Sequence, residues 1–311
     1  MSICIHIPFY NPSPNETVGY RKLTRYEYLK ENIENLKKLP HPVDIFVNTH
    51  NRFLDDKDLG VNIVKHNLSE SDLNRGILTW KTRNNMKQYA SLYDYFIYIE
   101  HDIKFTESNF EYWKEYNQKL KGKRLNLGFL IFERSNEDNS KYSVHLSNKI
   151  NKILIIDNEK YAINDVENYC CFWIYDKNFF HKFINSKWWN VNSKVTNYRH
   201  TYGNCEKVAI GMHALNIGYF KATIIPIQNN NFDERCKIEH LTNNYFYKFK
   251  DVKFLFSDIR SACRFKLDEL ISDKIKYYYK LPINLNLKDR FLWKFRFINK
   301  IFRLINRYRE K

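Results

Sequence analysis

Hydrophobic and polar positions follow a strand and helix rhythm from the start of the chain. Residues 3–7 alternate around isoleucine and stop at Pro8, which predicts a short buried strand. Residues 26–39 place Leu29, Ile33 and Leu36 at helical spacing before Pro40, and residues 43–48 and 61–64 form further apolar runs. Because strands separated by a crossover helix pair in parallel, the pattern predicts an α/β fold with an open sheet.

A second strand and helix pair follows, and it ends in acidic residues. The segment after Gly76 predicts a helix, and residues 95–99 (YFIYI) predict a strand that is buried on both faces. Glu100 and Asp102 come directly after that strand. Ligands of open parallel sheets bind outside the carboxyl ends of the strands, so we expect this acidic pair to lie at a ligand site.

The remaining pattern alternates less regularly. Residues 133–163 are polar with short apolar islands and predict no firm element. We expect helices from about residue 108, over 177–183, and from Glu206 to Gly218, together with strands over 127–132, 168–173 and 219–227.

Charge adds a possible surface partner. The net charge is +16, and residues 288–311 carry nine Lys or Arg against two acidic residues. Phe291, Phe295, Ile298, Phe302 and Ile305 recur there at steps of four and three, which predicts a basic amphipathic helix on an anionic membrane surface. A helix packed on the body of the protein remains the alternative.

Other features of the sequence limit the protein class. No stretch reaches the roughly 18–20 apolar residues of a membrane-spanning helix. Residues 1–10 lack a secretory pattern, so we expect a cytoplasmic protein that associates peripherally with the inner face of a membrane. We divide the chain into a main domain over 1–250 and a helical extension over 251–311, basic and amphipathic from about 288.

Two carboxylates at a strand end provide hard oxygen ligands of the kind that Mg²⁺ or Mn²⁺ prefers. Glu100 and Asp102 are two residues apart, so both can face one loop-side space. An exposed acidic turn is the alternative, because such short motifs often occur without function.

Several segments in order resemble the GT-A class of glycosyltransferases, and especially its large inverting family. They are IHIPFYN at 5–11, RGILTWKTRN at 75–84, YFIYIEHD at 95–102 and NCEKVAIGMHALNIGY at 204–219. The resemblance covers about residues 3–242. It implies a GT-A, Rossmann-like, mixed and mostly parallel sheet flanked by helices. The chain departs from the family where Glu100 replaces the first Asp of the metal motif and Cys205 precedes Glu206.

The resemblance also implies a reaction. It implies metal-dependent transfer of a sugar from a nucleotide sugar, with a UDP-sugar favoured, to a glycan or lipid-linked acceptor of the bacterial surface polysaccharide or lipooligosaccharide type. Asp102 is then the principal metal ligand, with Glu100 on the metal or the ribose and His240 on the metal or diphosphate. Glu206 is the general base. The alternatives are a first-turn glutamate that favours the helix dipole for Glu206 and an ordinary loop histidine for His240.

The same resemblance implies further contacts. Nucleotide contacts come from five residues after the first two strands: Pro8, Phe9, Tyr10, Asn11 and Asn48. Arg83 pairs with the diphosphate or else lies on a solvated helix face. Trp188 and Trp189 stack on an acceptor sugar or pack in the core.

Two other protein classes stay open. The charge and aromatic content also suit a nucleic-acid-binding protein, although no nucleic-acid-binding motif is present and we expect no nucleic acid partner. Glu100 and Asp102 would equally serve a metal-dependent phosphotransferase or nuclease.

Overall fold

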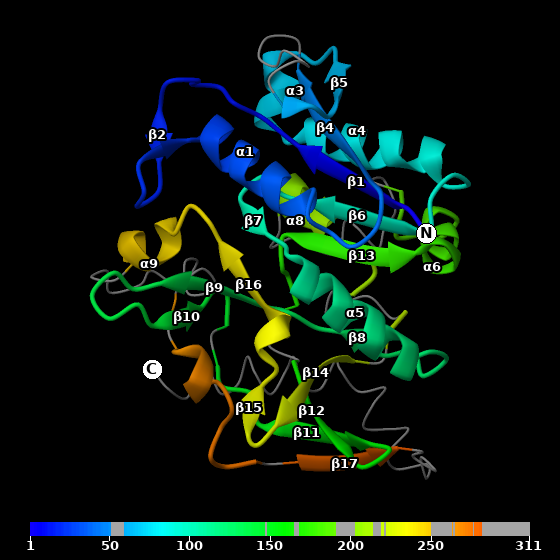
Figure 1. Cartoon of the computed structure of the whole chain (residues 1–311), viewed down its shortest axis with the longest axis vertical. Coiled ribbons are helices and arrows are strands. Elements are labelled where there is room, and N and C mark those ends of the chain that lie inside the picture. The colour runs from blue at the N-terminus through cyan, green and yellow to red at the C-terminus, as the bar shows by residue number, and fades with distance from the viewer. Residues whose placement is uncertain are drawn as a thin grey trace.

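A five-stranded, mostly parallel sheet forms the centre of the amino-terminal part of the molecule (Figure 1). The structure is a computed structural model that describes residues 1–50, 59–146, 148–164, 168–190, 203–213, 219–220, 222–249, 263, 265–275 and 277–281. The strand order is β13-β6-β1-β4-β5, in which only β13 runs antiparallel to its neighbour. Its strands are β1 (Ile3–Pro8), β4 (Val43–His50), β5 (Asn62–His66), β6 (Tyr95–Ile99) and β13 (Phe172–Asp176).

Side chains of this sheet alternate between two hydrophobic cores. Ile5 and Ile97 belong to one buried cluster, whereas Phe96 and Tyr98 belong to the other. Helices α1 (Arg25–Leu36) and α5 (Glu107–Lys119) contribute to the first cluster. The second contains residues of α4 (Ile77–Met86), α6 (Lys177–Ile184) and α8 (Asn204–Ala209). The sheet is therefore covered by helices on both faces, as its near-continuous apolar strands predict.

Local sequence signals explain where several helices begin. Thr24 caps α1 and Thr106 caps α5 in reciprocal capping boxes with the residue three positions later. A short helix, α3 (Glu70–Asn74), precedes α4 and begins at a similar box on Ser69. A 3₁₀ turn, η1 (Lys87–Tyr89), follows α4.

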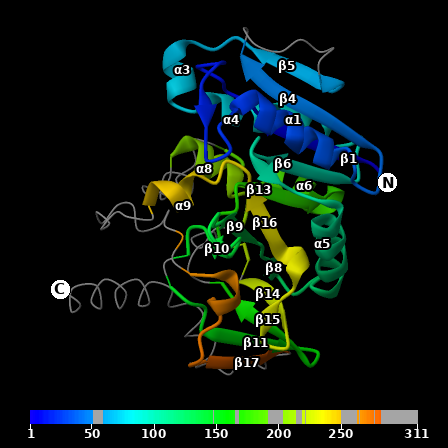
Figure 2. The ribbon, with the colours of Figure 1, turned by 60° about the vertical axis from the view of Figure 1, so that its left-hand side comes forward.

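Two further sheets extend the molecule away from the first (Figures 1 and 2). The four-stranded sheet comprises β10 (Lys141–Ser143), β9 (Leu130–Arg134), β16 (Lys237–His240) and β7 (Ile103–Lys104). The six-stranded sheet comprises β15 (Asn231–Phe232), β14 (Thr223–Gln228), β12 (Glu159–Ile163), β11 (Lys152–Ile156), β17 (Tyr277–Leu281) and β8 (Asn126–Leu127). A hairpin of β2 (Thr17–Val18) and β3 (Leu23–Thr24), two 3₁₀ turns, η2 (Glu234–Cys236) and η4 (Leu267–Glu269), and helix α9 (Asn244–Phe249) complete the elements.

The fold class predicted from the sequence is confirmed as mixed α/β, but several boundaries differ. The expected strand over 127–132 is two strands in two sheets, which separate at Gly128. A Cβ atom at Gly128 would lie 2.7 Å from Thr223 Cγ2, so glycine permits the close approach to β14. The strand expected from residue 168 begins only at Phe172, because Cys171 has a positive φ of 60°.

The carboxyl-terminal prediction also differs where the structure describes it. Within 251–311, the described residues include strand β17, which pairs in parallel with β11, instead of a wholly helical extension. The helix expected from Glu206 to Gly218 is shorter than predicted, because α8 ends at Ala209 and residues 210–213 are not helical. Residues 214–218 and the amphipathic segment 288–311 lie outside the described residues. In the described part of the chain, no helix is long and apolar enough to span a membrane.

Candidate active site

The acidic pair follows β6 at the carboxyl edge of the parallel strands, where the sequence predicts a ligand site. The Glu100 backbone is fixed on both sides. Its N–H donates to Cys171 O at 3.1 Å, and its carbonyl accepts from Asn32 Nδ2 at 3.1 Å. Both acidic side chains remain partly exposed, so they are neither in the core nor on a freely solvated turn.

A buried chain of hydrogen bonds connects Asp102, His240 and Glu133. His240 Nε2 lies 3.2 Å from Asp102 Oδ2, and His240 Nδ1 lies 2.5 Å from Glu133 Oε1. Strand pairing produces this arrangement, because β16 lies between β7 and β9. The His240 side chain is 8% exposed and the Asp102 side chain 13% exposed. The imidazole is therefore oriented toward Asp102 by a second carboxylate.

Glu133 is a residue that sequence reasoning missed. It is fully buried and accepts the backbone N–H groups of Tyr245 and Phe246 at 3.2 and 2.5 Å, at the start of α9. The available signal was its place directly after the apolar run 127–132, where a charged residue extends a buried strand. Its role was not predictable, because its partners lie more than 100 residues later in the chain.

Burial and neighbouring charges shift the pKa values of Glu100, Asp102 and His240. Burial, with the nearby Asp102 charge, raises the pKa of Glu100 to about 8. Burial alone would raise the pKa of Asp102, but His101 and His240 outweigh it and lower that pKa. Burial likewise opposes the charged form of His240, yet Asp102 and Glu133 raise its pKa to about 10. Such opposed shifts in neighbouring groups are typical of functional sites.

Glu206 lies close enough to this group to act on it electrostatically. It stands in the first turn of α8 and is partly exposed, and its charge contributes to raising the pKa of Glu100. Its carboxylate folds back toward Gly203, where an added Cβ would lie 2.6 Å from Glu206 Oε2. Asp102, His240, Glu100 and Glu206 are therefore brought together from three separate parts of the chain.

The donor set around Asp102 fits a divalent cation only in part. In the described residues, no group of three or more His, Cys, Asp or Glu side chains is arranged to hold a metal ion. Asp102 Oδ2 and His240 Nε2 nevertheless face each other, and a carboxylate on the other imidazole nitrogen is a usual partner of a metal-ligating histidine. Two protein ligands are enough where phosphate oxygens and water complete the shell of Mg²⁺.

The residues expected to contact a nucleotide differ in how exposed their side chains are. Phe9 is fully buried in the core, and Pro8 is a buried part of β1, so neither side chain is open to a ligand. Tyr10 is partly exposed. Asn11 is 3% exposed, and its Oδ1 has no hydrogen-bond partner among the described residues. Tyr10 and Asn11 therefore remain the candidates for nucleotide contact.

The expectation that Asn48 contacts a nucleotide is wrong. Its expected place was the end of a strand, but β4 continues to His50 and the Asn48 side chain is fully buried. Its Nδ2 lies 3.1 Å from His6 Nδ1, and its Oδ1 lies 2.9 Å from His66 Nε2. Asn48 thus connects two histidines inside the sheet and is not available to a nucleotide.

Arg83 is also placed differently from both expectations. It is 1% exposed, and its guanidinium lies 4.3 Å from the Phe183 ring centre and 4.4 Å from that of Trp189. Its Nη2 donates to the Trp188 carbonyl at 2.6 Å. The expectation that Arg83 lies on a solvated helix face is therefore wrong. The described contacts place its guanidinium among packed side chains, where it is not open to a diphosphate.

The described contacts of Trp188 and Trp189 agree with the expected alternative that they pack in the core. Trp189 is 8% exposed and packs edge-on against Phe183 at 5.1 Å in the second core cluster. Trp188 is partly buried and lies edge-on to Tyr219 at 5.8 Å. Their described partners belong to that core cluster and not to the Asp102 group.

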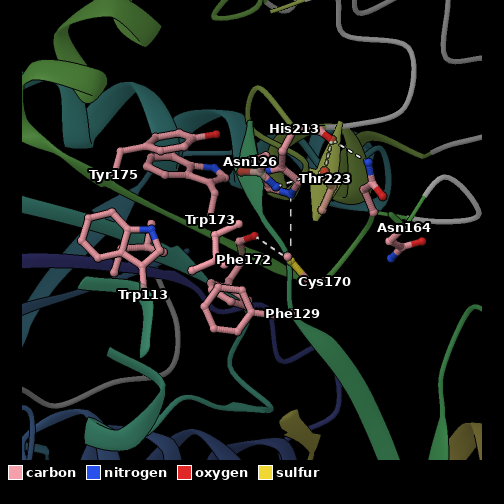
Figure 3. A pocket seen from close by; sticks show the side chains of 14 residues that line it. Trp113, Asn126, Phe129, Asn164, Cys170, Phe172, Trp173, Tyr175, His213 and Thr223 are labelled. Carbon is pink, nitrogen blue, oxygen red and sulfur yellow. Dashed lines mark hydrogen bonds between the residues drawn. The ribbon is translucent and has the colours of Figure 1, made fainter. Parts of the chain in front are cut away.

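Two cavities of the described part lie away from Glu100, Asp102 and His240. The first, shown in Figure 3, has a volume of about 20 Å³, which suits about one water molecule. His213, Cys170 and Thr223 line it, and the His213 carbonyl accepts from Asn168 at 2.9 Å. The second measures about 340 Å³ and lies between the 158–160 and 226–230 segments. Residues 191–202 and 214–218, which precede and follow the described segment that contains Glu206, lie outside the described residues.

Comparisons with known proteins give the chain no family. It matches no protein-family model and no curated protein. Similar solved structures include a cytidylyltransferase from Leptospira borgpetersenii serovar Hardjo-bovis, with 12% identity over 63% of this chain and 69% of that chain and a TM-score of 0.31. They also include S. aureus TarS 1-349, with 11% identity over 77% of this chain and 60% of that chain and a TM-score of 0.36. At these values the similarities say nothing about the substrate of this chain.

Proposed function

We propose that this protein is a metal-dependent glycosyltransferase of the GT-A class that uses a nucleotide sugar as donor. The observation that carries the proposal is the meeting of Asp102 and His240 at the carboxyl edge of a parallel sheet, beside Glu100 and Glu206. This edge is where open α/β sheets bind ligands. A UDP-sugar is the favoured donor, and a glycan or lipid-linked sugar is the acceptor.

The residues of the site have separate roles in this reaction. Asp102 and His240 would hold Mg²⁺ or Mn²⁺, with Glu133 orienting the imidazole. When bound, the cation offsets negative charge on the diphosphate. Tyr10 and Asn11 follow β1 at the same edge, where they would contact the nucleotide.

Glu206 acts as the general base. It accepts the proton of the acceptor hydroxyl while that oxygen attacks the anomeric carbon of the donor sugar. The bond between the anomeric carbon and the diphosphate oxygen breaks, and the nucleoside diphosphate leaves with that electron pair. Attack from the opposite side inverts the anomeric centre.

Transfer assays on two variants test these roles. Glu206→Gln should lower the transfer rate by about 100-fold or more, because a positioned base contributes about that factor. It should keep donor binding, whereas Asp102→Ala should lose both transfer and metal-dependent donor binding.

A matched control separates the base from a helix-dipole glutamate. Glu107 occupies the first turn of α5 as Glu206 does in α8, but its side chain is exposed. Glu107→Gln should leave transfer unchanged. Wild-type turnover in Glu206→Gln contradicts the assigned base.

The basic carboxyl-terminal segment is part of this proposal. The basic residues 288–311 are proposed to bind an anionic membrane surface at its cytoplasmic side, which would bring the site to a lipid-linked acceptor.

A further inference from the structure

Three aromatic side chains lie beside the acidic residues and form a continuous series of contacts from Glu100 to His240. The His145 ring centre lies 5.3 Å from that of Tyr169 and 5.4 Å from that of Tyr245, both near edge-on. Tyr245 in turn stacks on His240, with ring centres 5.3 Å apart and planes inclined by 30°. We call His145, Tyr169 and Tyr245 the aromatic wall.

Both ends of the aromatic wall reach the carboxylates. Tyr169 donates its hydroxyl to Glu100 Oε1 at 2.8 Å. At the other end, His240 contacts Asp102 at 3.2 Å. Burial raises the pKa of Tyr245, and Cys171, Glu100 and Asp102 add to the shift, so this ring lies within the electrostatic reach of both acids.

The aromatic wall differs from the buried aromatic residues of the core. Its three members are partly exposed, whereas Phe9, Trp189 and Trp173 are 8% exposed or less. Its members come from the loop after β10, the loop before β13 and the first turn of α9. Three segments that are distant in sequence therefore bring partly exposed rings together beside the acidic residues.

Unusual backbone conformations hold two of these loops in place. His145 has a φ of 67°, and Cys171, two residues after Tyr169, has a φ of 60°. Non-glycine residues seldom adopt this left-handed region, and such residues concentrate at functional sites. Val144 N donates to Ile131 O at 2.9 Å and Glu100 N to Cys171 O at 3.1 Å, which anchors both loops next to the acids.

An aromatic face beside carboxylates suits one ligand class. A pyranose ring presents apolar C–H groups on its faces and hydroxyl groups at its edge. The faces pack on aromatic rings, and the hydroxyls donate to carboxylates. We propose that the aromatic wall is a sugar-stacking subsite for a pyranose ring, a role that rests on the proposed glycosyltransferase function.

Tyr245 gives the sharpest test, because its hydrogen bond to Glu133 comes from the backbone N–H and survives a change of side chain. Tyr245→Leu removes the aromatic face, and Tyr245→Phe keeps it. Tyr142→Leu is the matched control, since Tyr142 is a partly exposed tyrosine of β10 that packs on Phe246 of α9, with ring centres 4.8 Å apart. Circular dichroism confirms that each variant folds.

Calorimetric titrations in the presence of Mg²⁺ measure the affinity of each variant for three ligands. They are UDP, the tightest binder among UDP-glucose, UDP-galactose and their N-acetylated forms, and the methyl glycosides of the same sugars on the UDP-saturated enzyme. We expect Tyr245→Leu to weaken binding of one sugar ligand about tenfold and UDP by less than about twofold, as for loss of an aromatic contact. A loss confined to the nucleotide sugar assigns the wall to the donor, and one confined to the glycoside assigns it to the acceptor.

The outcomes separate the two proposals. Unchanged sugar binding in Tyr245→Leu, or an equal loss in Tyr142→Leu or for UDP, overturns the aromatic wall alone. A wild-type protein that binds none of the nucleotide sugars overturns the proposed function and the wall together.

Discussion

At the scale of single residues, two kinds of buried or partly buried polar groups bear on function and stability. Those at the sheet edge, such as Asp102 and His240, face one another across the candidate site. Those inside the sheet, such as His6 and Asn48, serve packing. The first kind supports the proposed chemistry, and the second makes stability depend on pH.

His6 should make the protein sensitive to acid. Burial lowers the pKa of His6 to about 3, with the nearby His66 adding to the shift. The folded state therefore keeps His6 neutral, while the unfolded chain protonates it below about pH 6.5, so stability is lost as the pH falls below that value. Between pH 6.5 and 4.5 this loss amounts to about 2 kcal/mol.

Urea unfolding of His6→Gln at several pH values measures that contribution. Glutamine still accepts a hydrogen bond from Asn48 but does not titrate. The unfolding free energy of the variant should therefore fall less steeply over the same range. Equal slopes for the variant and the wild type contradict the buried neutral histidine.

Glu133 should matter for stability more than its neighbour on the adjacent strand. Glu133→Gln removes a fully buried charge that His240 and two backbone N–H groups contact, at a cost of about 2 kcal/mol in unfolding free energy. Glu239→Gln removes a partly exposed partner of Arg134 and should cost less than about 1 kcal/mol. Denaturant unfolding distinguishes them, and equal effects would count against the buried Asp102, His240 and Glu133 chain.

At the scale of elements, the turn after β16 connects three separate parts of the chain. Leu241 N donates to Asp102 O at 2.8 Å, and Asn243 Oδ1 accepts from Arg134 N at 2.8 Å. The Thr242 carbonyl accepts from Tyr20 N of the β2–β3 hairpin at 3.0 Å. This turn therefore fixes the position of His240 relative to Asp102.

Gly19 permits the hairpin to approach that turn. It has a φ of 70°, and an added Cβ would lie 2.0 Å from the Thr242 carbonyl oxygen. Gly19→Ala should lower the unfolding free energy by about 3 kcal/mol, from overpacking in addition to left-handed strain. Gly122→Ala is the control, because Gly122 has a similar φ of 79° with nothing within 4 Å and should show strain alone, about 1 kcal/mol. Similar losses in both variants would mean that the hairpin does not dock as described.

At the scale of the whole molecule, apolar periodicity was enough to predict the first sheet. The strands at 3–7, 43–48, 61–64 and 95–99 and the helix that ends before Pro40 have strong local signals. The region 133–163 was not predictable, because its short strands pair with residues as distant as β14 and β17. Such strands are specified by tertiary contacts more than by local pattern.

The site was predictable to a similar degree. Glu100 and Asp102 follow a recognisable strand, and Glu206 opens a recognisable helix. Arg83 and Asn48 were misplaced because their burial depends on partners from other elements, Trp188 and His66. The aromatic wall had no local signal, since its loops meet only in the folded chain.

Electron paramagnetic resonance of free Mn²⁺ tests the central claim most directly. Titrating Mn²⁺ into the protein with and without a nucleoside diphosphate, UDP first, measures whether the two bind together at Asp102. We predict that the diphosphate strengthens Mn²⁺ binding in the wild type and in Glu206→Gln, and that Asp102→Asn removes this effect. Diphosphate-dependent Mn²⁺ binding that persists in Asp102→Asn, or is absent from the wild type with every nucleoside diphosphate, would contradict the proposed enzyme.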